Sequence, residues 1–288
     1  MVRLEFLTEL GYEVSGPGAD FIFSIQAAHT SRQTVVTESL QISQSVPTTE
    51  YIDPATKTRF LRLRAGAGHL RVRYAAIVDI AHHQAPPQQL PELSPLAVPG
   101  EILPYLFPSR YCQSDRLLNL ASQHFGHLPM GYTRAKAVCD WVKQHVSFQS
   151  NTSNSNTSAL DTLIERVGVC RDFAHLMIAL CRAANLPARM ASGMDYGADP
   201  ALGPPDFHAY VEVFLAGGWY LFDPSGTAIP MGFVRFATGR DAADIAFATI
   251  YGGVSAAQPI ITIQAVPNAQ GQLVTPQHVD YALSTDSP

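Results

Sequence analysis

The first eighty residues alternate between apolar and polar positions with the two-residue period of a β-strand. The alternation runs through residues 35–42. It is clearest over residues 59–80, where apolar positions alternate with arginine on both sides of the glycine turn at 66–68. We expect a β-hairpin there, with the arginines on a solvated face. Strands and turns at this spacing predict an antiparallel β-sandwich-like domain.

Prolines interrupt this pattern and indicate a domain boundary. Seven of them lie between residues 86 and 108, which predicts a stiff, extended linker. We therefore assign residues 1–105 to a β-rich N-terminal domain whose linker starts at about residue 82, and residues 106–288 to a second domain. An apolar run at 259–266 predicts a strand in that second domain, and the polar last twenty residues are expected to be partly disordered.

A 3.6-residue apolar period after residue 114 predicts helices. Ser114 is the expected N-cap of a helix that reaches about residue 125, and Thr133 that of a helix that reaches about residue 146. Ser158 and Asp161 form a capping box at the start of a short helix that ends near Gly168. Strands are expected again after residue 186, so the chain combines helices with sheets and its fold class is α+β.

The helix predicted at residues 168–184 opens on a cysteine. Its apolar positions recur at i, i+3, i+4, i+7, i+8 and i+11, and Cys170 lies on the same stripe just after a glycine. The positive end of the helix dipole and the free N–H groups at its start favour the thiolate, which is the nucleophilic form of cysteine. A small apolar core residue is the alternative interpretation of Cys170.

Two candidate partners of this cysteine lie on a predicted β-hairpin. Whether His208 and Asp223 meet depends on the register of its strands. A turn centred on Ala216-Gly217 places Asp223 opposite Tyr210, so that His208 is a diagonal neighbour about 7–8 Å away at the backbone. A turn shifted by one residue places Asp223 opposite Glu212, which is too far from His208. We predict the first register.

Cys170, His208 and Asp223 have, in this order, the logic of a nucleophile, a base and an orienting group. The sequence around them resembles the transglutaminase-like superfamily in four pieces, Gly168-Val-Cys-Arg-Asp-Phe-Ala-His175, Leu186-Pro-Ala-Arg189, His208-Ala-Tyr-Val-Glu212 and Gly218-Trp-Tyr-Leu-Phe-Asp-Pro-Ser225. The resemblance implies a papain-like core of helices packed on an antiparallel sheet, preceded by the β domain of bacterial members, and it assigns the family's triad to these three residues. Tyr210 and Ser225 stand where the family usually has Trp and Thr, which affects the expected substrate groove and not the triad.

From these residues we expect a cysteine acyl-transfer enzyme that acts on a peptide or protein and needs no cofactor and no metal. Cys170 attacks a carbonyl carbon, His208 takes the thiol proton, Asp223 orients the imidazole, and the backbone N–H of Cys170 faces the oxyanion. The expected outcome is hydrolysis of a peptide or amide bond by a cysteine peptidase or amidase. The alternatives are transamidation of protein glutamines, a zinc site made by the same three residues, and a catalytically silent binding or scaffold protein.

Composition narrows these classes further. The 288 residues are 47% hydrophobic and 15% charged, with a net charge of −5, as in a globular protein long enough for two domains. No basic stripe favours nucleic acid, and no apolar run of about 18 residues predicts a membrane span. The four cysteines lack zinc-site spacing and the N-terminus does not read as a signal peptide, so we expect free thiols in a bacterial cytoplasm. The sequence leaves the oligomeric state open.

Overall fold

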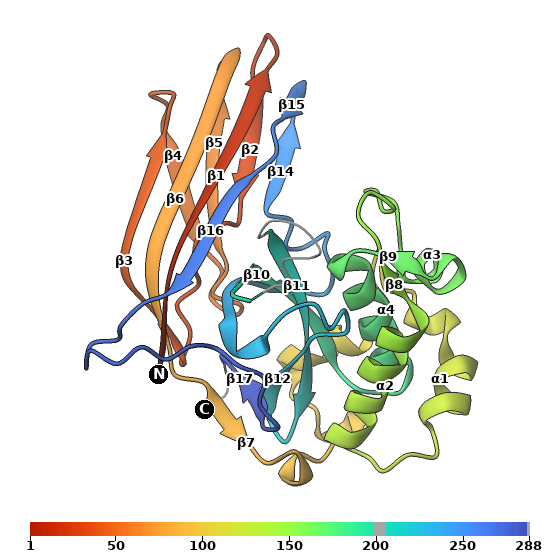
Figure 1. Ribbon diagram of the computed structural model, residues 1–288. Helices are drawn as coiled ribbons and strands as arrows, with labels where there is room; N and C mark the ends of the chain where they lie inside the picture. The colour runs from red at the N-terminus through yellow and green to blue at the C-terminus, as the bar shows by residue number, and fades with distance from the viewer. Residues whose placement is uncertain (198–205, 287–288) are drawn as a thin grey trace.

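The computed structural model describes residues 1–197 and 206–286, and it consists of a β-sandwich beside a core of helices and a sheet (Figure 1). One sheet of the sandwich contains β1 (Val2–Val14), β3 (Gln33–Ile42), β6 (Gly68–Ile80), β15 (Val254–Ala256) and β16 (Ile260–Ala265). The facing sheet contains β2 (Ala19–Phe23), β4 (Thr48–Ile52), β5 (Arg59–Ala65) and β14 (Ala248–Tyr251). All these strands pair in antiparallel fashion, so the predicted sandwich is confirmed.

The predicted hairpin over residues 59–80 is wrong, although both of its strands exist. β5 pairs with β2 and β4, whereas β6 pairs with β1 and β3, so the turn at 66–68 carries the chain from one sheet to the other. The apolar residues of the two strands face each other across the buried core, and Arg62, Arg64 and Arg71 lie on the solvated faces as expected. Alternation of apolar and polar residues indicates which side of a strand is buried, but it does not predict which strand pairs with it.

The C-terminal part of the chain returns to the sandwich, which corrects its assignment to the second domain. β16 confirms the strand predicted at 259–266, but residues 260–265 pair with residues 4–9 of β1 and not with the sheet of the core. β15 extends the same edge of β1, and β14 pairs with β2 in the facing sheet. The core is therefore inserted between the sixth strand of the sandwich and its last three (Figure 1).

The core sheet has the order β12–β11–β10–β13 and is antiparallel. Its strands are β10 (Ala188–Asp195), β11 (Phe207–Leu215), β12 (Gly218–Phe222) and β13 (Phe233–Gly239). The helices are α1 (Leu118–Phe125), α2 (Tyr132–His145), α3 (Ala159–Glu165) and α4 (Cys170–Ala183). Helix α4 packs against one face of β10 and β11 and is surrounded by the other three helices. Helices on an antiparallel sheet confirm the α+β class.

The predicted helix starts are partly right. The capping box of α3 is present, because the backbone N–H of Ser158 donates to Asp161 Oδ2 at 2.8 Å. Thr133 is not a cap, because α2 already begins at Tyr132, after Gly131, whose N–H donates to Glu92. Ser114 opens a short 3₁₀ turn, and α1 begins only at Leu118. The free backbone N–H groups at the start of a helix can therefore be bound by a carboxylate from a distant segment as well as by a local capping residue.

The linker and the C-terminal tail are both packed against the core. The linker forms the short strand β7 (His83–Ala85) and several 3₁₀ turns, and its Val98 and Ile102 are buried against Trp219. The tail was expected to be partly disordered, but residues 282–284 of it form β17 (Ala282–Ser284), which pairs with β7. The remaining pair, β8 (Ser147–Phe148) and β9 (Val167–Gly168), is parallel and leads directly into α4.

Candidate active site

The start of α4 is shaped by a carboxylate two residues beyond the cysteine. The backbone N–H of Val169 donates to Asp172 Oδ2 at 2.8 Å, and Ser153 Oγ donates to the other carboxylate oxygen at 3.0 Å. A Cβ on Gly168 would come within 2.7 Å of Asp172 Cβ, so this close approach requires glycine. Cys170 is the first helical residue, and its N–H therefore has no acceptor within the helix.

The register of the β11–β12 hairpin is the one predicted. Leu215 pairs with Gly218, so the turn is Ala216-Gly217, with φ values of 51° and 85°. Two successive residues with positive φ make a type I′ turn, which suits the twist of a two-residue hairpin. His208 Nε2 and Asp223 Oδ1 lie 3.4 Å apart as a result.

Asp223 is held as a buried carboxylate. Its Oδ1 accepts hydrogen bonds from Ser225 Oγ at 2.6 Å and Ser225 N at 3.0 Å, and its Oδ2 accepts one from Ala228 N at 3.0 Å. Burial alone raises the pKa of Asp223, but the charge of His208 and these hydrogen bonds outweigh it and hold the pKa below its usual value. Ser225 thus contributes directly to the site.

His208 lies between this carboxylate and the thiol. Burial lowers the pKa of His208, but negative charge on Cys170 and Asp223 and hydrogen bonds to both raise it well above the ordinary value. With Nε2 directed at Asp223, Nδ1 is the ring nitrogen left for the sulfur. The same sulfur lies 4.0 Å from the carbonyl oxygen of Phe207. The three predicted residues are therefore together, and the surroundings favour an imidazolium.

Sequence reasoning missed a second contact to the histidine. From the sequence alone we expect Asp195 in a solvated loop over residues 194–206, but it is the last residue of β10 and is buried. Tyr210 Oη donates to Asp195 Oδ1 at 2.7 Å, and the Tyr210 ring stands edge-on to the His208 ring with centroids 4.7 Å apart. Burial raises the pKa of Asp195 to about 7. Tyr210 and His208 occupy alternate positions of one strand, and this pattern was the available signal.

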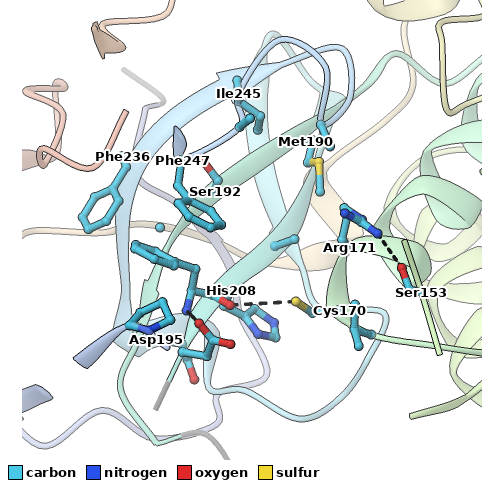
Figure 2. A pocket seen from close by; sticks show the side chains of 18 of the residues that line it. Ser153, Cys170, Arg171, Met190, Ser192, Asp195, His208, Phe236, Ile245 and Phe247 are labelled. Atoms are coloured by element: carbon cyan, nitrogen blue, oxygen red, sulfur yellow. Dashed lines mark hydrogen bonds between the residues drawn. The ribbon is translucent and has the colours of Figure 1, made fainter. Parts of the chain in front are cut away.

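A cleft of about 830 Å³ opens over these residues. Figure 2 shows Phe236 and Phe247 on one side of Cys170 and His208, and Arg171 with Ser153 on the other. Arg171 donates to Ser153 Oγ and to the carbonyl oxygen of Asn154. As a lid, the loop expected at residues 194–206 would restrict access to Cys170. Residues 198–205 of that loop, which include Asp199, lie outside the described residues.

Two residues considered for the site lie elsewhere. The sequence offers the indole N–H of Trp141 as an oxyanion donor, with packing on a helical stripe as the preferred interpretation. Trp141 stacks on His145 with ring centroids 3.8 Å apart and lines a separate cavity of about 250 Å³. Glu212, the first candidate from the sequence to orient His208 in place of Asp223, receives a hydrogen bond from Arg189 Nε at 2.6 Å. Neither residue lines the cleft above Cys170.

Geometry gives no support to the zinc alternative. Over residues 1–197 and 206–286, no three His, Cys, Asp or Glu side chains are arranged to hold a metal ion. Within the same ranges, no helix is long and apolar enough to cross a membrane.

Comparison with known proteins identifies the family. The model of the transglutaminase-like superfamily matches residues 119–224, and that of the bacterial transglutaminase N-terminal domain matches residues 2–96. A crystal structure of a candidate cysteine protease from Cytophaga hutchinsonii is 37% identical, with a TM-score of 0.90 over 98% of this chain and 97% of that one. The chain belongs to the transglutaminase-like superfamily.

Other relatives in sequence extend this family without adding an activity. The uncharacterized protein ML0607 of Mycobacterium leprae is 24% identical over 92% of this chain and 98% of its own length. The uncharacterized protein Mb2599c of Mycobacterium bovis is 30% identical over about a third of each chain. These two similarities are therefore to proteins that are described only as uncharacterized.

Proposed function

We propose that this protein is a cysteine acyl-transfer enzyme that hydrolyses a peptide or amide bond. The observation that carries the proposal is the meeting of Cys170, His208 and Asp223 at one cleft, with His208 paired to a buried carboxylate on one side and to the thiol on the other. The shared family with a candidate cysteine protease supports it.

The reaction proceeds through an acyl-enzyme. The Cys170 thiolate attacks the carbonyl carbon while the imidazolium of His208 holds the thiol proton, and that proton then passes to the leaving amine as the C–N bond breaks. His208, now neutral, takes a proton from water, whose oxygen attacks the thioester. The C–S bond breaks, the acid leaves, and the thiolate–imidazolium pair is restored. Asp223 keeps the ring in one tautomer throughout.

The start of α4 supplies electrostatic stabilisation. The backbone N–H of Cys170 is free of intrahelical bonds and points from the positive end of the helix dipole. It is the donor we assign to the oxyanion of the tetrahedral intermediate. A preorganised donor of this kind typically contributes about 10²–10³ in rate.

Water is the acceptor we favour over an amine. Water is present at about 55 M, so an amine competes only where a site binds it or excludes water. Transamidation is the second candidate because of one observation. The carboxyl groups of Asp195 and Asp206 both line the cleft near His208. Such groups would hold an ammonium ion.

A peptide library incubated with and without a labelled primary amine tests both outcomes by mass spectrometry. We expect cleaved peptides without incorporated amine, and loss of cleavage in Cys170→Ala. Asp223→Asn keeps the shape but removes the charge that orients the imidazolium, so turnover should fall by about 10²–10⁴ with unchanged circular dichroism. Amine incorporation into glutamine peptides, lost in Cys170→Ala, would make the protein a transglutaminase in the strict sense.

A further inference from the structure

An aromatic pair forms one wall of the cleft directly beside the thiol. Phe207 precedes His208, and its carbonyl oxygen lies 4.0 Å from Cys170 Sγ. The ring of Phe207 stacks on that of Phe247, with centroids 4.5 Å apart and an interplanar angle of 13°. Phe247 is nevertheless 40% exposed, within a concave site. An exposed phenyl ring in a cleft offers a surface for an apolar ligand.

The surroundings of this pair are apolar as well. The side chains of Phe236, Ile245 and Met190 line the same cleft and are each at most 3% exposed. Phe236 also stands edge-on to Phe207, with ring centroids 6.3 Å apart. In Figure 2 both Phe236 and Phe247 lie on the side away from Arg171. Buried apolar side chains therefore continue the lining of the cleft beyond the aromatic pair.

The wall is held in place by the N-terminal sandwich. Ser24, just after β2, donates its backbone N–H to the carbonyl oxygen of Phe247 at 3.1 Å and its hydroxyl to that of Ala246 at 2.7 Å. From residue 248 the chain continues into β14, which pairs with β2. Hydrogen bonds on both sides of Phe247 thus fix the segment that carries its ring, so that the surface exists before a ligand arrives.

We propose that this wall is the subsite for a large apolar side chain, preferentially aromatic, of a peptide residue that flanks the scissile bond. The inference rests on the proposed function, which supplies the attack by Cys170. An aromatic ring buried against Phe247 loses its contact with water, and offset stacking adds to the gain. Differences of this kind in side-chain burial change kcat/KM by about tenfold to hundredfold.

The experiment measures kcat/KM for two peptide series, with Phe or Ala at each position flanking the cleaved bond. Wild-type protein should prefer Phe by about tenfold or more at one of these positions. Phe247→Ala should remove most of that preference, because kcat/KM for the Phe peptides falls toward that for the Ala peptides, whereas Phe247→Leu, which keeps an apolar surface, should keep part of it. Tyr251→Ala is the matched control, because Tyr251 is a 60% exposed aromatic residue of β14 outside the cleft.

The outcomes separate this inference from the proposed function. Equal cleavage of Phe and Ala peptides by wild-type protein, or an unchanged preference in Phe247→Ala, overturns the subsite and leaves the hydrolase in place. Cleavage of no peptide overturns the proposed function. In that event calorimetric titration of Cys170→Ala with the same peptides still tests the wall, and equal affinities overturn it. Thermal melts and the alkylation rate of Cys170 show whether Phe247→Ala has kept its fold.

Discussion

A nucleophilic cysteine has to be reachable, and the four cysteines of this chain differ in that respect. Cys112, Cys139 and Cys181 are buried, whereas Cys170 is half-exposed at the mouth of the cleft. Burial raises the pKa of Cys112 and of Cys139 to about 12 and raises that of Cys181 as well. Three of the thiols are therefore protonated and enclosed at neutral pH.

We expect brief treatment with iodoacetamide near pH 6.5 to modify Cys170 alone. His208 beside it remains protonated because its pKa is raised, and a neighbouring cation favours the thiolate. Peptide mass spectrometry reads the modified site, and the denatured protein, in which all four thiols are accessible, is the control. Equal reactivity of the four cysteines in the folded protein, or an inert Cys170, would contradict the arrangement described here.

The sequence predicted the residues that carry the site better than the residues that tune it. Cys170, His208 and Asp223 were recognisable because helix period, strand alternation and turn position indicate where each one lies, and because the resemblance to the transglutaminase-like superfamily assigns its triad to them. The role of Asp195 was not recognisable, because its partner Tyr210 lies on a neighbouring strand and the local sequence pattern does not predict that β10 pairs with β11. Asp195 is buried only once the sheet has assembled, so its burial cannot be predicted from the residues next to it in the sequence.

At the scale of elements, the β11–β12 turn sets the distance between His208 and Asp223. Ala216 adopts a φ of 51°, which costs an alanine about 1 kcal/mol but which asparagine tolerates. Nothing lies within 4 Å of a Cβ added to Gly217, whose φ is 85°, so a substitution there reports on backbone strain alone.

Ala216→Asn should therefore raise the free energy of unfolding by about 0.5–1 kcal/mol, and Gly217→Ala should lower it by a similar amount. Urea denaturation followed by circular dichroism measures both variants, and each serves as the control of the other. Effects of the same sign, or no change in either, would be inconsistent with a type I′ turn at this position.

The pattern of apolar and polar residues predicts helices and strands more reliably than it predicts which segments contact them. β5 and β6 were predicted as strands from alternating residues, but they were joined as a hairpin because alternation cannot distinguish a turn within a sheet from a crossing between two sheets. In the same way Ser158 caps α3 through its neighbour Asp161, which is a local signal, whereas α2 is capped by Glu92 from the linker.

At the scale of the molecule, the C-terminal tail is anchored by charge. Asp286 lies 2.9 Å from Arg189 Nη2 and 3.0 Å from Arg235 Nη1, and both arginine side chains are almost fully buried. Glu212 is the other carboxylate beside them. The last twenty residues were predicted to be partly disordered because they are polar. The two arginines that bind Asp286 belong to strands some fifty and a hundred residues earlier, so no local sequence pattern reveals this anchor.

Asp286→Asn should lower the free energy of unfolding by about 1–3 kcal/mol at pH 7, because it leaves a buried positive charge uncompensated. Burial raises the pKa of Asp286, but Arg235 and Arg189 outweigh it and lower the pKa. Because its pKa is lowered in the folded protein, the ionised Asp286 stabilises the fold at pH values above the ordinary pKa of 3.8. This stabilisation is lost as the pH falls below 3.8 and through the lower pKa of the folded protein. The difference from wild type should thus shrink in acid. Asp280→Asn, an exposed change in the same tail, is the control, and equal melting temperatures for the two variants at pH 7 would refute the anchor.

The insertion of the core within the sandwich has a consequence for biosynthesis. As the chain leaves the ribosome, β1 can pair with β6 early, but its other edge stays open until β15 and β16 have been made. By then all four helices and the strands that carry His208 and Asp223 have already emerged. An open edge can pair with other chains, so the nascent N-terminal domain depends for its protection on strands that are synthesised after the core sheet. Most of the core has thus emerged before the domain that precedes it can close, and only β17 and the anchor at Asp286 follow.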